Sequence, residues 1–160
     1  MRFRFKGLNE YVDMLDQISS VFAREYVIEA ALQDGADVVA DEQKKALEGL
    51  KVDNRPYVEG KRDSILQIQK TGLIKSFGIT PVQQKRNLID VKTGFDGYNA
   101  LGQPNVMIAR MLESGTSFMD KNPVISKATK RARNDCLNAM QDRITLEIDK
   151  IKARNKKGLF

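Results

Sequence analysis

Residues 105–130 read NVMIARMLESGTSFMDKNPVISKATK, and this stretch decides how the chain folds. Four apolar residues come first, at helical spacing: Val106, Ile108, Met111 and Leu112. Gly115 then predicts the end of this helix and Pro123 the start of another, because glycine suits a C-terminal cap and proline a first turn. A stop and a start so close together indicate a rigid corner that sets the direction of the last helix.

The polar residues of this corner favour structure over chemistry. Gly115 predicts a backbone conformation that other residues resist, and the hydroxyl of Thr116 or Ser117 can satisfy nearby backbone groups. Glu113 beside Arg110 could be drawn as an active site, but such spacings are expected in any soluble domain. The same holds for Asp90 and Asp96 further up the chain. We therefore predict no catalytic residue and expect that the protein is not an enzyme.

The pattern A-R-x-x-E-x-G-T-S, followed by x-N-P-x-I-x-x-A, resembles the signature of the tail-completion, or head–tail joining, proteins of long-tailed bacteriophages. The matching residues are Ala109, Arg110, Glu113, Gly115, Thr116, Ser117, Pro123 and Ala128. The order along the chain is similar as well: an N-terminal strand ending at residues 6–8, a long helix, a β region, the corner and a final helix. The chain departs from the family pattern at Val124, where an aromatic residue would be expected.

This resemblance implies a structural virion protein of the phage neck or tail, assembled in the host cytoplasm. Such a protein completes the tail or joins it to the head connector as a homo-oligomeric ring, sixfold, around the DNA channel. Its partners would be the tail terminator or tube proteins and the head connector proteins, with non-specific contact to passing DNA. The family has no catalysis and no cofactor. The structural corner motif would consist of Arg110, Glu113, Gly115, Thr116, Ser117 and Pro123.

Composition favours one soluble domain. The chain has 160 residues, of which 41% are hydrophobic and 30% charged; we predict a single domain over residues 1–153 and a basic, frayed tail over residues 154–160. No apolar run approaches the ~20 residues that a membrane span needs. A single cysteine, Cys136, and the absence of histidine argue against a metal site and against the commonest general base.

Positive charge is concentrated in the last quarter of the chain. Residues 121–160 hold 11 Lys or Arg and 4 Asp or Glu, so this segment alone carries +7 while the whole chain carries +6. This asymmetry favours an acidic partner or nucleic acid. The alternative function is therefore a non-specific nucleic-acid-binding module that uses this segment, although its basic residues are not interleaved with aromatics. The candidate contacts are Lys127, Lys130, Arg131 and Arg133.

Upstream of the corner, the periodicity predicts a strand over 2–6, a helix over 8–18 and a long helix over 21–50. The apolar face of the long helix is predicted at Ile28, Leu32, Gly35, Val39, Ala46 and Leu50. Its acidic residues lie mostly off that face, where they fit a solvated surface or a contact with the basic segment of a neighbouring subunit. Gly35 indicates either the close approach of another element or a kink.

The middle of the chain predicts a loop over 51–70, with a short helix around 64–69, and a β region over 73–95. Residues 85–87 would be the turn of a hairpin. The tip would carry Gln83, Gln84, Lys85 and Arg86, which suit channel or partner contacts and equally well a solubilising turn. The glycine-rich loop over 93–104 lacks the context of a nucleotide-binding motif.

The last helix is predicted over 123–153, with one apolar stripe at Ile125, Ala128, Ala132, Cys136, Ala139, Met140, Ile144, Ile148 and Ile151. At ~1.5 Å per residue this helix would be about 45 Å long, which is longer than the core of such a domain needs. Part of the helix is therefore expected to pack on another subunit. Cys136 is interpreted as a small buried residue. The fold class is thus α+β: a small antiparallel sheet with long helices packed on it and a long C-terminal helix.

Overall fold

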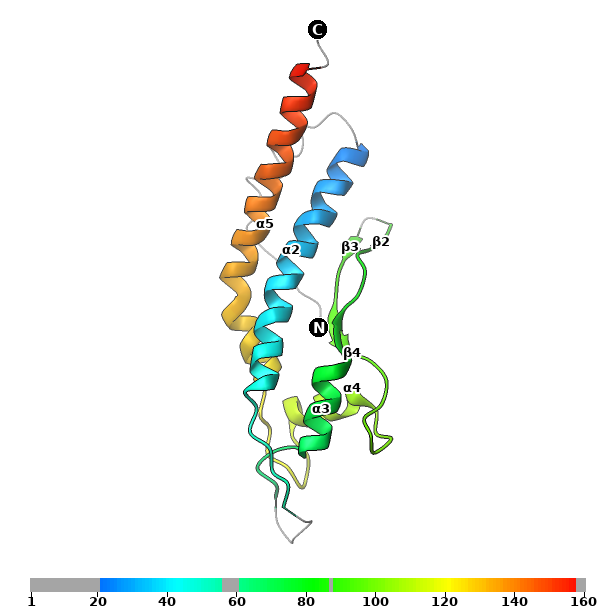
Figure 1. Ribbon diagram of the computed structural model, residues 1–160, viewed down its shortest axis with the longest axis vertical. Helices are drawn as coiled ribbons and strands as arrows, with labels where there is room; N and C mark the ends of the chain where they lie inside the picture. Colours follow the sequence, from blue (N-terminus) through cyan, green and yellow to red (C-terminus); the bar gives the residue numbers. More distant parts are fainter. Residues whose placement is uncertain (1–20, 56–60, 87, 158–160) are drawn as a thin grey trace. The chain divides into compact units, whose positions relative to one another are not determined.

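The computed structural model describes residues 21–55, 61–86 and 88–157. Its helices are α2 (Val21–Glu48), α3 (Gln67–Ser76), α4 (Asn105–Ser114) and α5 (Val124–Lys157). Its strands are β1 (Phe77–Ile79), β2 (Gln83–Lys85), β3 (Leu88–Asp90) and β4 (Thr93–Phe95) (Figure 1). These elements confirm the α+β class and the long C-terminal helix. The predicted strand over 2–6 and helix over 8–18 lie outside the described residues.

The chain forms two compact units. The first is made by residues 1–38, 81–92 and 134–160, and the second by residues 39–80 and 93–133. Both long helices contribute to each unit, since α2 divides after Val38 and α5 after Arg133. The prediction of one domain over residues 1–153 stays a prediction.

In the first unit, α2 and α5 pack closely at Gly35. A Cβ atom at this position would lie 2.7 Å from Met140 Cγ and 3.1 Å from Cys136 Sγ. Glycine inside a helix costs about 1 kcal/mol relative to alanine, and the close approach of α5 explains why it occurs here. Cys136 is buried, as predicted, and burial raises the pKa of its thiol.

The buried face of α2 is displaced from the predicted one. Ile28, Leu32 and Ala46 are only half-buried. The buried residues of α2 are Val27, Ala31, Gly35, Ala36, Val39, Ala40, Gln43 and Leu47, and Leu50 is buried just beyond its end. Gly35, Val39 and Leu50 of the predicted face are thus buried as expected. The prediction failed because Gln43 is polar but fully buried, where its Nε2 donates a 2.8 Å hydrogen bond to Thr129 Oγ1.

The stripe predicted for α5 is confirmed almost completely. Of its nine residues, Ala139 and Ile151 are half-buried and the others are buried. The helix continues to Lys157, four residues beyond the predicted end at Ala153. Residues 154–157 are therefore helical and not the frayed tail that their composition predicted, and residues 158–160 lie outside the described part of the chain.

The predicted middle of the chain needs two corrections. The short helix begins at Gln67 and not near Ser64, and it runs to Ser76, through the first residues of the predicted β region. The strands form two separate antiparallel pairs, β1 with β4 and β2 with β3, so there is no single sheet among the described residues. Three residues, including Pro81, link β1 to β2, whereas two link β3 to β4. Proline lacks the N–H that a continuous ladder would use.

The second unit has its own apolar core, built around the end of α2, α3, α4 and the start of α5. The buried residues are Leu47, Leu50, Ile65, Leu73, Ile108, Ala109, Leu112, Met119 and Ile125. Each fully buried Leu or Ile contributes roughly 1.5–3 kcal/mol relative to exposure. The edge of this core holds Phe77 and Phe95, whose ring centroids lie 5.5 Å apart. This core is the support on which the corner between α4 and α5 rests.

Candidate functional site

Glu113 joins the end of α4 to the beginning of α5. Its carboxylate accepts hydrogen bonds from the backbone N–H of Ile125 at 2.7 Å and of Ser126 at 3.2 Å, and from the hydroxyl of Ser126. The first N–H groups of a helix have no partner within the helix, and negative charge is favourable there. A carboxylate from another helix thus fixes where α5 begins.

Gly115 ends α4 in a backbone conformation that other residues resist. Its φ angle is 75°, and its N–H donates a 2.8 Å hydrogen bond to the carbonyl of Met111. A Cβ atom here would lie 2.8 Å from the backbone nitrogen of Lys121 and 3.1 Å from the carbonyl oxygen of Met119. Both the φ angle and the lack of space select glycine, as the sequence predicted.

Backbone hydrogen bonds close the turn between the two helices. The N–H of Thr116 donates to the carbonyl of Met119 at 2.8 Å, and the N–H of Asn122 donates to the carbonyl of Leu112 at 2.7 Å. The Thr116 hydroxyl accepts from the N–H of Phe118 at 3.3 Å. Thr116 therefore satisfies a nearby backbone group, as predicted. Pro123 directly precedes the first residue of α5.

The turn is also held by the segment that precedes α3. The N–H of Arg62 donates a 2.7 Å hydrogen bond to the carbonyl of Phe118, and Lys61 Nζ lies 2.8 Å from Asp120 Oδ1. Lys61 and Asp120 are both exposed, so their ion pair is worth little. The backbone contact between residues 62 and 118 is the stronger connection.

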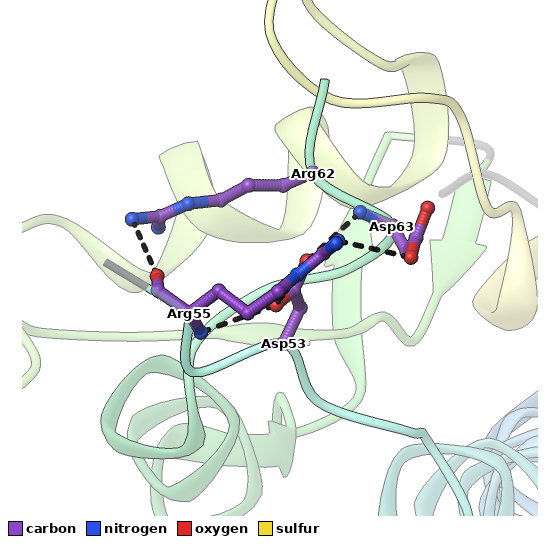
Figure 2. A network of polar contacts seen from close by, with 4 residues as sticks. All are labelled: Asp53, Arg55, Arg62 and Asp63. Carbon is purple, nitrogen blue, oxygen red and sulfur yellow. Dashed lines mark hydrogen bonds and ion pairs between the residues drawn. The ribbon is translucent and has the colours of Figure 1, made fainter. Parts of the chain in front are cut away.

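A network of charged residues that the sequence did not predict lies on this same segment (Figure 2). Asp53 is almost fully buried and accepts hydrogen bonds from Arg55 Nε at 2.8 Å, from Arg55 Nη2 at 2.6 Å and from the N–H of Asp63 at 3.1 Å. Arg55 Nη2 also lies 3.0 Å from Asp63 Oδ2, and Arg62 Nη2 donates to the carbonyl of Arg55 at 3.4 Å. The network joins residues 53–55 to residues 62–63.

This network is built for structure and not for proton transfer. The Arg55 guanidinium, together with the N–H groups of Asp63 and Arg55, holds the pKa of Asp53 far below its usual range. Asp53 in turn raises the pKa of Arg55 above its already high value. A carboxylate that stays charged throughout the physiological range is a poor general acid or base. The signal in the sequence was only a polar loop with D-N-R spacing, which is too common to identify such a network.

A hollow of about 500 Å³ lies beside the network. Its lining comes from the end of α2, from residues 51–55 and from Asp63, Ser64, Asn122 and Val124. The carboxylates that reach it, Asp53 and Asp63, are both paired with Arg55. Lys51 lines the hollow as well, and no pair of free carboxylates converges in it.

Arg110 and Ser117 belong to the predicted motif but not to this hydrogen-bonded corner. Both are exposed. Within residues 21–55, 61–86 and 88–157 the structure places no hydrogen bond or ion pair on the Arg110 side chain. The corner thus unites Glu113, Gly115, Thr116 and Pro123, while Arg110 projects from α4 on the opposite side from the buried residues of that helix.

The predicted contact residues are all on the surface but lie on different elements. Gln83, Gln84 and Lys85 form β2 and Arg86 begins the turn, with a φ angle of 53°. The basic residues of α5 are Lys127, Lys130, Arg131 and Arg133. Arg131 Nε lies 3.1 Å from Glu42 Oε1 on α2 of the same chain, and Arg143 pairs in the same way with Asp34 at 3.7 Å. Two acidic residues of α2, Asp34 and Glu42, therefore already have basic partners within the chain.

The described part of the chain holds neither a metal site nor a membrane span. The described ranges contain no group of three or more Cys, Asp or Glu residues that could hold a metal ion. None of the helices described is long and apolar enough to cross a membrane. Comparisons with protein-family models, with curated proteins and with solved structures found no match to this chain.

Proposed function

We propose that this protein is a structural subunit of a phage neck or tail, which completes the tail or joins it to the head connector as an oligomeric ring around the DNA channel. The observation that carries the proposal is the corner, in which the Glu113 carboxylate caps α5 from the end of α4. Four of the eight residues that resemble the tail-completion signature build this joint: Glu113, Gly115, Thr116 and Pro123.

A rigid connection between α4 and α5 suits a subunit that must hold its contact faces at a fixed angle. A ring closes only if each copy presents its two different contact faces at a fixed angle. The turn between α4 and α5 is held by the Glu113 cap, by the backbone bonds of Thr116 and Asn122, and by the contact of residue 62 with residue 118. A helix of 34 residues that leaves this turn would carry a small error in direction over a long distance.

The experiment uses particles in which this protein is missing. Purified protein is added to tails that lack it, together with heads that bear a connector, and joined particles are counted by electron microscopy. The wild-type protein should bind one end of the tail and restore joining, whereas Gly115→Val should bind poorly. Tails that join heads equally well without the protein would overturn the proposal.

A second candidate is a non-specific nucleic-acid-binding module, which the exposed cations of α5 favour. Lys127, Lys130 and Arg133 are exposed, in addition to Lys85 and Arg86 at the hairpin. Duplex binding that weakens steeply with salt would support this candidate. The state of assembly distinguishes the two candidate functions. A dedicated DNA-binding module would bind duplex DNA as a small species and would leave tails unjoined.

A further inference from the structure

The exposed side of α4 carries an arginine beside two apolar side chains. Val106 and Met107 are 44% and 43% exposed, and each lies one helical turn from Arg110. We define Val106, Met107 and Arg110 as the arginine face. The loop immediately before α4 exposes Tyr98 and Leu101 as well.

This loop is held firmly although its apolar side chains face solvent. Asn99 is buried, and its Oδ1 accepts hydrogen bonds from the N–H groups of Leu101 at 2.9 Å and Gln103 at 3.1 Å. Gly102 has a φ angle of 72° and donates to the carbonyl of Asn99 at 2.9 Å. The exposed Tyr98 and Leu101 are therefore presented by an ordered loop next to the arginine face.

A surface with opposite charge lies on α5. From residue 134 to residue 149 the exposed charged side chains are Asp135, Asp142 and Asp149, which are spaced by seven residues and so share one side of the helix. Leu146 is 47% exposed and lies one turn from both Asp142 and Asp149. We define these four residues as the aspartate face. The one basic residue within this section, Arg143, is half-buried and pairs with Asp34 at 3.7 Å and with Glu147 at 3.2 Å. The exposed basic residues of α5 lie before and after this section.

We infer that the arginine face of one copy binds the aspartate face of a second copy. Two features of the surfaces support this pairing. Arg110 offers a planar fork of donors that fits a carboxylate, and the apolar side chains beside it match the exposed Leu146. Interfaces are enriched in Arg, Met and Tyr at their centre, and all three occur on or next to the arginine face.

The inference rests on the proposed function and gives it a specific contact. Because the two faces differ, their pairing is head-to-tail, which is the type of contact that generates a ring when the rotation closes. It also gives Arg110 a role, although this residue takes no part in the corner formed by the other motif residues.

The test reverses the charges of the two faces and measures the mass of the assemblies that form. Sedimentation of the full-length protein across a concentration series is compared for wild type, Arg110→Glu, Asp142→Arg and the double variant. Each single reversal should weaken self-association at least about tenfold, because like charges then face each other. The double variant should recover most of the association. Matched controls are Lys75→Glu and Asp41→Arg, which reverse exposed charges outside both faces and should associate like the wild type.

Three outcomes would overturn the inference. Single reversals that leave the oligomer unchanged, or a double variant no better than the single ones, would show that another surface makes the contact and would leave the proposed function standing. A wild-type protein that stays monomeric throughout the series would exclude a second copy as the partner. In that case the addition of the protein to tails decides the proposed function separately.

Discussion

The Glu113 carboxylate on α4 accepts a 2.7 Å hydrogen bond from the backbone N–H of Ile125, in the first turn of α5. This contact spans twelve residues of sequence, so one helix supplies the cap of the next. The direction of α5 is therefore tied to α4 and, through Ala109 and Leu112, to the core of the second unit.

Replacing Glu113 should test the strength of this cap. Glu113→Ala is expected to destabilise the protein by about 1–2 kcal/mol, because the N–H groups of Ile125 and Ser126 lose their acceptor. Glu113→Gln keeps one side-chain oxygen and should cost less. Urea unfolding followed by circular dichroism measures both variants, and an alanine variant as stable as the wild type would contradict the role given to the cap.

Gly115 should tolerate no side chain. Gly115→Val is expected to cost more than about 2 kcal/mol and to impair assembly, because the new atoms would meet the backbone of Lys121 in a backbone conformation that is already unfavourable. Gly102→Ala separates the two causes, since Gly102 also has a positive φ angle but no described atom within 4 Å of an added Cβ. It should cost less than Gly115→Ala in thermal unfolding; equal costs would mean that space is irrelevant at Gly115.

Asp53 should make the stability depend on acid pH. Its pKa in the folded protein is lower than its unfolded value of about 3.9, so its stabilising contribution is fully present above that value and is lost as the pH falls toward the folded pKa. Asp53→Asn should thus be less stable than the wild type at pH 7, and the difference should shrink toward pH 2. The control is Asp41→Asn, which removes an exposed carboxylate outside this network and should give no such pH dependence. A difference between Asp53→Asn and the wild type that is constant across pH would contradict this account.

Gly35 and Met140 should be energetically coupled. Gly35→Ala is expected to destabilise the protein by about 1–3 kcal/mol, because its Cβ would overlap Met140 Cγ. In a Met140→Ala background the same change should cost less, since only the 3.1 Å contact with Cys136 Sγ stays tight and alanine is the better helix former by about 1 kcal/mol. A double-mutant cycle measures the coupling, and additive effects would show that α2 and α5 are not in close contact at this point.

The long helices and the corner were predictable from local pattern. The stripe of α5 consists almost entirely of apolar residues, so its period is visible from Ile125 to Ile148. Gly115 marks the end of one helix and Pro123 the start of the next, and both effects depend on the local backbone alone. The buried face of α2 was predicted less well, because a pattern of apolar residues cannot indicate that the polar Gln43 is buried.

The contacts that hold the corner in place were not predictable. The acceptor for the first turn of α5 is twelve residues away, and the Arg62 contact with Phe118 depends on the packing of the core. The helix α3 was missed at its true position because it buries Gln69 along with Leu73. Gln69 accepts from the N–H of Leu66 at the start of its own helix and donates to the side chain of Gln103, which lies 34 residues further along the chain.

The mass of the purified protein across a concentration series, with and without duplex DNA, decides between the ring and the nucleic-acid-binding module. If the subunits form a ring, we expect a closed oligomer of defined size, which forms without DNA and which Gly115→Val and Arg110→Glu both weaken. A stable monomer that binds duplex DNA in low salt and releases it as the salt concentration rises would contradict the ring and favour the nucleic-acid-binding module.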